Sequence, residues 1–188
     1  MTEGPEHTTR PLWVFGYGSL LWNPGFPVAE TRLATLHGFA RSFCMSSIHH
    51  RGTVEHPGLV LALDPRESTS CRGMGFRVAD DEAEQTVSYL RERELISSAY
   101  VERELPVVLD GGAEVRALVY VVDTLHEQYV ADLTLEEQAQ IISTAVGGRG
   151  PNTEYLWNTA RHLSELGISD ESLDWLAARV DELTGTAA

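Results

Sequence analysis

Residues 12–22 read LWVFGYGSLLW and combine a short apolar run with a glycine-rich turn. The apolar run, Leu12–Tyr17, is typical of a buried strand. The stretch Gly16–Ser19 then predicts a tight turn directly after the strand. Such a turn exposes backbone N–H groups, which can bind an anion or a polarised carbonyl oxygen, although most turns of this composition have no such role. The third glycine of a dinucleotide-binding loop is missing, because Leu21 stands in its place.

Further strands follow this turn along the chain. Alternating or continuous apolar runs predict strands at Arg32–Met45, Leu59–Leu63, Gly73–Val78, Val101–Leu109 and Val115–Val122. The histidine-rich segment Ser46–Gly58 reads as a loop. Asp110-Gly111-Gly112 separates the last two runs and is a strong hairpin signal, because glycine supplies the positive φ that such turns need.

Helical signals dominate the middle and the C-terminal third. Asp81 with Glu84 predicts a capping box at the start of a first helix, and Thr134 with Glu137 predicts a second one. Gly147-Gly148 is expected to end the second helix. A third helix is expected to have Pro151 in its first turn and to end at Gly167, and Asp170–Leu183 is expected to form a fourth helix.

The order of these elements predicts an α+β fold, with a mixed or mainly antiparallel sheet curled toward a barrel and flanked by helices. We expect a flexible tail at residues 1–10 and a single domain at residues 11–188.

Composition narrows the class of protein. The formal net charge is −14, with 28 acidic against 14 basic residues, so the surface repels phosphate backbones and no nucleic-acid partner is expected. All the basic residues are arginine, which excludes lysine Schiff-base chemistry and a P-loop lysine. The only cysteines, Cys44 and Cys71, read as reduced thiols. There is no signal-peptide pattern and no membrane-spanning run, so we expect a cytoplasmic protein without membrane contact.

Glu94 stands out on the first predicted helix. At about 100° per residue, it falls on the apolar stripe formed by Ala83, Val87 and Leu90. Glu92 projects to the opposite, solvent side. A buried carboxylate has a raised pKa, which suits a general base. Two alternatives remain at this point: the helix ends before Glu94, or Arg93 or Arg103 pairs with Glu94 in a purely structural salt bridge.

A metal site is not expected. His49, His50 and His56 lack the spacing of a known ligand set. Neither Cys44 nor Cys71 lies in a nucleophile signature, so both read as buried structural thiols.

Five segments share a pattern with a known family: VFGYGSLLW at Val14–Trp22, Arg51-Gly52 with Pro57–Leu63, CRGMGFRV at Cys71–Val78, YLRERELISSAY at Tyr89–Tyr100, and GRGPNTEY at Gly148–Tyr155. Taken together and in this order, they resemble the ChaC family of γ-glutamylcyclotransferases. Members of that family convert glutathione to 5-oxoproline and cysteinylglycine. The resemblance implies a barrel-like core with flanking helices, no metal and no organic cofactor.

The resemblance also implies roles for individual residues. Glu94 matches the catalytic glutamate that follows an arginine in a Y-L-x-x-R-E segment. The predicted substrate-binding residues are Phe15, Gly16, Tyr17, Gly18, Ser19, Leu20, Tyr100, Arg51 and Tyr129. The α-amine of the substrate would attack its own γ-carbonyl, after Glu94 has accepted its proton.

Three rival interpretations stay open. The substrate could be another γ-glutamyl amine or dipeptide. The chain could instead be a non-catalytic regulator that keeps the fold and binds a partner protein. A metal-dependent hydrolase using the histidine loop would release free glutamate, which cyclisation never does.

Overall fold

Five strands close into a barrel in the order β1-β3-β2-β4-β5. They are β1 (Trp13–Gly16), β2 (Val28–Ser47), β3 (Gly58–Val78), β4 (Tyr100–Leu109) and β5 (Glu114–Val122). β1 runs parallel to β5, and every other pair in the barrel is antiparallel. This computed structural model describes residues 10–186, so the predicted tail lies outside the described residues except for Arg10. The predicted α+β fold with a curled, mixed sheet is confirmed.

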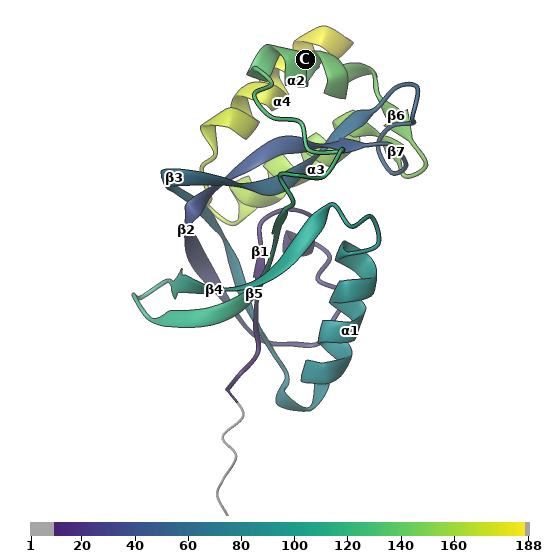
Figure 1. Cartoon of the computed structure of the whole chain (residues 1–188). Coiled ribbons are helices and arrows are strands. Elements are labelled where there is room, and N and C mark those ends of the chain that lie inside the picture. Colours follow the sequence, from purple (N-terminus) through teal and green to yellow (C-terminus); the bar gives the residue numbers. More distant parts are fainter. Residues whose placement is uncertain (1–9, 187–188) are drawn as a thin grey trace, which may run out of the picture.

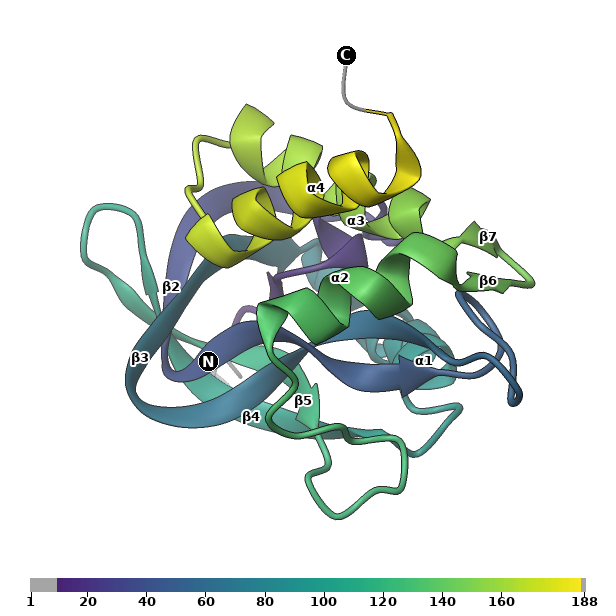
Figure 2. The same cartoon turned by 90° about the horizontal axis from the view of Figure 1, so that it is seen from above.

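The helices lie in two places around the barrel (Figure 1). They are α1 (Ala83–Glu94), α2 (Leu135–Thr144), α3 (Asn152–Glu165) and α4 (Glu171–Thr184), with single 3₁₀ turns η1 (Ser19–Leu21) and η2 (Asp80–Glu82). α2, α3 and α4 contact one another and cover one end of the barrel, as the view from above shows (Figure 2). α1 lies against the side of the barrel. Two short strands, β6 (Val146–Gly147) and β7 (Gly150–Pro151), form a small ribbon before α3.

β2 and β3 form one long antiparallel arm. The expectation of two separate strands at Leu59–Leu63 and Gly73–Val78 was wrong, since β3 continues through the polar residues between them. The exposed residues 65–70 give no apolar signal, but the strand continues through them, and Pro65 and Ser70 pair with β2. The pairing skips from Ser70 to Pro65, where Ser68 has φ 61° and an irregularity bulges outward. The predicted loop is confirmed over residues 48–57.

Local turn and cap signals were mostly reliable. The β4–β5 hairpin forms where predicted, with φ of 95° at Gly111 and 91° at Gly112. The second capping box is also confirmed, because the N–H of Glu137 donates to Thr134 Oγ1 at 3.2 Å. At Asp170 the side chain caps α4 by accepting from the N–H of Leu173 at 3.1 Å.

Three helix-boundary expectations need correction. Asp81 makes no capping box, because it lies in η2 and the N-cap of α1 is Glu82, whose side chain accepts no capping hydrogen bond. Acidic side chains in η2 instead lie near the positive end of the α1 dipole. Pro151 is the N-cap of α3 rather than a residue of its first turn. α2 ends at Thr144, before the glycine pair at residues 147–148.

Two apolar clusters hold the helices to the barrel. The larger one joins inward side chains of the barrel to α2, α3 and α4, and the smaller one joins β1, β3 and β5 to α1 through the fully buried Leu90. No helix among residues 10–186 is long and apolar enough to cross a membrane.

Candidate active site

Glu94 is the last residue of α1, and only 18% of its side chain is exposed. Glu92 is exposed, so the helical projection of both side chains is confirmed. Burial raises the pKa of the Glu94 carboxyl above its ordinary value of 4.5, while the adjacent Arg93 acts in the opposite direction. The Arg93 Nε to Glu94 Oε1 distance is 3.1 Å. The ion pair therefore exists, but it does not overcome the effect of burial.

Arg93 also ties the end of α1 to the glycine-rich turn. Its Nη2 donates to Ser19 Oγ at 3.0 Å, and its Nη1 donates to the carbonyl oxygen of Asn23 at 2.6 Å. The same Nη1 donates to the hydroxyl of Tyr89 at 3.1 Å. Glu94 is consequently held beside the turn, although more than 70 residues separate Ser19 from Arg93.

The turn itself offers free backbone donors. Gly18 and Leu20 are buried, and Gly18 precedes the 3₁₀ turn η1. Within the described part of the chain, the N–H groups of Gly18, Ser19 and Leu20 donate no hydrogen bond. Buried backbone donors without a partner are rare and costly. These groups can therefore receive a ligand oxygen.

Three tyrosines, Tyr17, Tyr100 and Tyr155, form a tyrosine cluster on which the charge of Glu94 acts. Burial raises the pKa of each phenol, and the charge on Glu94 contributes further to each increase. The pKa of Tyr155 rises to about 12. All three hydroxyls therefore remain neutral donors at physiological pH.

Leu61 on β3 fixes two of these phenols. The hydroxyl of Tyr100 donates to the Leu61 carbonyl at 2.9 Å, and the Leu61 N–H donates to the Tyr155 hydroxyl at 3.3 Å. The Tyr155 hydroxyl donates its own proton to no other described residue. A Cβ added at Gly18 would lie 3.5 Å from that hydroxyl and 3.9 Å from Leu61 Cβ. Gly18 and Tyr155 therefore face one another across a narrow space.

The remaining predicted residues lie at the margin of this site or away from it. Phe15 is fully buried in the larger apolar cluster. Arg51 Nη1 donates to the carbonyl of Arg149 at 2.8 Å, and its guanidinium carbon lies 5.8 Å from the Tyr155 ring centroid. The hydroxyl of Tyr129 donates to Asp64 Oδ1 at 2.9 Å. Arg51 thus borders the tyrosine cluster. Tyr129 does not, because its partner Asp64 lines a separate cavity.

Sequence reasoning missed Tyr155 and Leu61. Tyr155 lies inside a family-like segment, but nothing in its spacing along the chain to Gly18 indicates that these two residues lie close together. Leu61 acts only through its backbone, so its side-chain type carries no signal.

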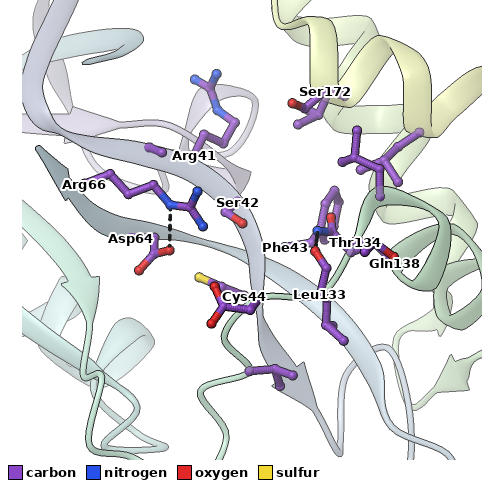
Figure 3. Close-up of a pocket in the computed structure, with 16 residues that line it drawn as sticks. Arg41, Ser42, Phe43, Cys44, Asp64, Arg66, Leu133, Thr134, Gln138 and Ser172 are labelled. Atoms are coloured by element: carbon purple, nitrogen blue, oxygen red, sulfur yellow. Dashed lines mark hydrogen bonds and ion pairs between the residues drawn. The ribbon is translucent and has the colours of Figure 1, made fainter. Parts of the chain in front are cut away.

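A separate cavity of about 380 Å³ opens between β2, β3 and the starts of α2 and α4 (Figure 3). Arg66 Nε lies 3.2 Å from Asp64 Oδ2 at its floor. Cys44 also lines it, and burial together with Asp64 raises the pKa of this thiol to about 12. Neither Glu94 nor the turn lines this cavity.

Metal-ligating side chains do not cluster in residues 10–186, where no group of three or more His, Cys, Asp or Glu side chains could hold an ion. The imidazoles of His49, His50 and His56 lie in exposed positions of the loop between β2 and β3.

Comparisons with known proteins agree on one family. The model of the family described as "ChaC-like protein" matches residues 12–183. A glutathione-specific gamma-glutamylcyclotransferase of Escherichia coli is 36% identical over 92% of this chain and 74% of its own length. One from Schizosaccharomyces pombe is 38% identical over 92% of this chain and 90% of its own length.

A solved structure extends the likeness to three dimensions. The crystal structure of a γ-glutamyl cyclotransferase specific to glutathione from yeast superposes with a TM-score of 0.82 at 25% identity, covering 93% of this chain and 99% of that chain. A selenomethionine-labelled form of the yeast protein gives a TM-score of 0.85 at 24% identity, over 95% of this chain and 99% of that one. The barrel, the buried glutamate and these matches lead to one assignment: the chain belongs to the ChaC-like protein family.

Proposed function

We propose that this protein is a γ-glutamylcyclotransferase, a lyase that converts glutathione to 5-oxoproline and cysteinylglycine. The bacterial and fission-yeast relatives carry the name of this activity and align with most of the chain. The observation that carries the proposal here is the buried carboxylate of Glu94, with its raised pKa, beside a turn whose backbone donors are unused.

Glu94 acts first as a general base. The α-ammonium of the glutamyl group loses a proton to the Glu94 carboxylate, and the free amine attacks the γ-carbonyl carbon. This forms the C–N bond of a five-membered lactam and places negative charge on the carbonyl oxygen. Because nucleophile and electrophile belong to one molecule, enforcing the bent conformer removes much of the entropic barrier.

The turn stabilises the charge that develops. Gly18, Ser19 and Leu20 donate their free N–H groups to the oxyanion of the tetrahedral intermediate. Protonated Glu94 gives its proton to the cysteinyl nitrogen as the bond between that nitrogen and the γ-carbon breaks. The regenerated carboxylate then takes the second proton from the ring nitrogen, which leaves the neutral lactam, and passes it to the departing amine. No water is consumed, and Glu94 ends the cycle as a carboxylate.

The neutral phenols complete the pocket. Tyr17 and Tyr100 line it, while Tyr155 supplies a hydroxyl proton that is free to bind a substrate oxygen. We assign substrate contact to Gly16–Leu20 and Tyr100. Arg51 borders the pocket beside Tyr155, and Phe15 supports the turn from the core, whereas Tyr129 bonds to Asp64, which lines the separate cavity.

The proposed reaction needs no metal, since Glu94 and backbone donors account for every proton and charge. We further propose that residues 11–188 work as one domain in the cytoplasm, where the free, buried Cys44 and Cys71 stay reduced. Activity should survive dialysis against a chelator. A loss that added zinc or manganese restores would favour the metal-dependent hydrolase instead.

Mass spectrometry of the products tests the proposal directly. Incubation with glutathione should yield 5-oxoproline and cysteinylglycine, and γ-glutamyl-alanine should react more slowly. Faster turnover of γ-glutamyl-alanine would move the assignment to another γ-glutamyl substrate. Free glutamate would indicate hydrolysis, and an absence of turnover on both compounds would leave the non-catalytic regulator.

A further inference from the structure

A second arginine, Arg41 on β2, also contacts the turn, through a residue other than the one that Arg93 contacts. Only 3% of its side chain is exposed, and each of its three guanidinium nitrogens donates a hydrogen bond. Its Nε donates to the carbonyl oxygen of Tyr17 at 2.7 Å, and its Nη1 donates to Asp170 Oδ2 at 2.8 Å. Its Nη2 donates to the carbonyl oxygen of Arg72.

The contact to Tyr17 fixes a peptide unit of the proposed oxyanion site. The Tyr17 carbonyl and the Gly18 N–H belong to the same planar trans peptide, so they point in opposite directions. Holding the carbonyl oxygen toward Arg41 therefore directs the Gly18 N–H away from it. We propose that Arg41 is a positioning residue, which orients the Gly18 N–H toward the γ-carbonyl oxygen of the substrate.

Asp170 extends this arrangement to the last helix. Its Oδ2 pairs with Arg41, while its Oδ1 accepts from the N–H of Leu173 and caps α4. One carboxylate thus anchors both the start of α4 and the guanidinium that holds the turn. A buried charge is tolerated when it is hydrogen-bonded and an opposite charge is near, and Arg41 meets both conditions.

The turn is consequently held by two arginines. Arg93 holds the side chain of Ser19, and Arg41 holds the backbone of Tyr17. Arg93 also contacts Glu94, so changing it would disturb the base itself. Arg41 has no such contact, which makes it the residue on which positioning can be tested separately.

The proposal rests on the proposed function, and its test uses one readout that needs turnover and one that does not. The first is kcat and KM for 5-oxoproline formation. The second is the ¹⁵N–¹H chemical shift of the Gly18 amide. Arg41→Lys keeps the charge but cannot reach three acceptors at once. We expect kcat to fall by about ten-fold or more with a smaller change in KM, and the Gly18 signal to move.

Two further variants separate positioning from general stabilisation. Asp170→Asn keeps a capping oxygen but removes the charge that orients Arg41, so both readouts should shift in the same direction by a smaller amount. Arg179→Gln is the matched control, because Arg179 joins α4 to Glu136 on α2 at 2.9 Å and does not touch the turn. It should leave kcat and the Gly18 signal unchanged, even if the melting temperature falls.

Each result decides whether Arg41 positions the Gly18 N–H or only stabilises the fold. A folded Arg41→Lys protein with wild-type kcat and an unmoved Gly18 signal would overturn the positioning role, as would equal kcat losses in Arg41→Lys and Arg179→Gln. If the wild type forms no 5-oxoproline, the proposed function fails on that result alone. The Gly18 signal then still decides the role of Arg41. If Arg41→Lys does not fold, the Asp170→Asn variant takes its place in the test. An unchanged kcat and an unmoved Gly18 signal in that variant would overturn the proposal.

Discussion

Glu94 is subject to two opposing electrostatic effects. Loss of hydration raises its pKa, whereas Arg93 at 3.1 Å favours the charged form. The guanidinium has other acceptors, including Asn23 and Ser19, so it is not left without partners when Glu94 is changed. This permits a clean substitution at the proposed base.

Glu94→Gln should reduce kcat by a factor of roughly 10² or more, because an amide of the same shape cannot accept the proton. KM should change little. The folded protein should be as stable as the wild type or more stable, since a poorly hydrated charge is removed. Steady-state 5-oxoproline formation and thermal melting measure both effects.

Glu92→Gln is the matched control, because Glu92 is exposed on the same helix. It should behave like the wild type in both measurements. The catalytic assignment is wrong if Glu94→Gln keeps near wild-type activity or if Glu92→Gln is the inactive variant.

The raised pKa of Glu94 also predicts a pH dependence of stability. The wild type carries the cost of a buried carboxylate only where Glu94 is ionised, so this cost appears as the pH rises from 4.5 through the folded-state pKa. Glu94→Gln lacks it. The stability advantage of the variant should therefore vanish at about pH 4 and grow as the pH rises through the folded-state pKa. Melting curves across this range test it, and an advantage that grows on acidification would contradict it.

At the scale of elements, the turn after β1 limits the size of the side chain that Gly18 can be replaced with. Its Gly18 has φ −137°, so its backbone does not require glycine through a positive φ. The size of the side chain at Gly18 is restricted instead by Tyr155 and Leu61. An added Cβ would make ordinary van der Waals contact with these residues, and a larger side chain would fill the space between Gly18 and Tyr155.

Gly18→Val should raise KM strongly because its methyl groups enter this space, and Gly18→Ala should have a smaller effect in the same direction. Circular dichroism and kinetics together separate loss of binding from loss of fold. A well-folded Gly18→Val protein with the KM of the wild type would show that the turn does not bind substrate.

The elements that the sequence predicts well are those whose signals are local. The Gly111-Gly112 hairpin and the Thr134 capping box depend on residues at most a few positions apart. β3 was divided in error because its solvent-facing centre carries no apolar signal, although Pro65 and Ser70 on either side of that centre pair with β2. Arg41 was missed altogether, since its partners Tyr17 and Asp170 lie 24 and 129 residues away. Its role depends on the closed barrel, which spacing along the chain does not describe.

At the scale of the whole molecule, α3 is fastened to the barrel by one buried amide. Asn152 has no exposed surface, and its side chain accepts from the Leu59 N–H at 2.7 Å and donates to the Leu59 carbonyl at 2.8 Å. These two bonds join the helix that carries Tyr155 to the strand that carries Leu61. The position of Tyr155 therefore depends on this connection.

Asn152→Ala should lower the free energy of unfolding by roughly 2–4 kcal/mol, because both Leu59 backbone groups lose their partner inside the protein. Urea denaturation measures this loss. Asn158→Ala on the same helix is the control, since the Asn158 side chain accepts only an exposed bond from Arg161. Similar small losses in both variants would contradict the inferred role of Asn152.

The order in which the site is assembled has a consequence for synthesis of the protein. A chain emerging from the ribosome presents Tyr17 and Glu94 early, but Tyr155 and the Asp170 that anchors Arg41 arrive only near its end. Nascent and truncated chains thus lack the last wall of the pocket and the anchor of the turn. Consumption of glutathione would begin only when a complete molecule is released, so the cell would not lose its thiol reserve to unfinished enzyme.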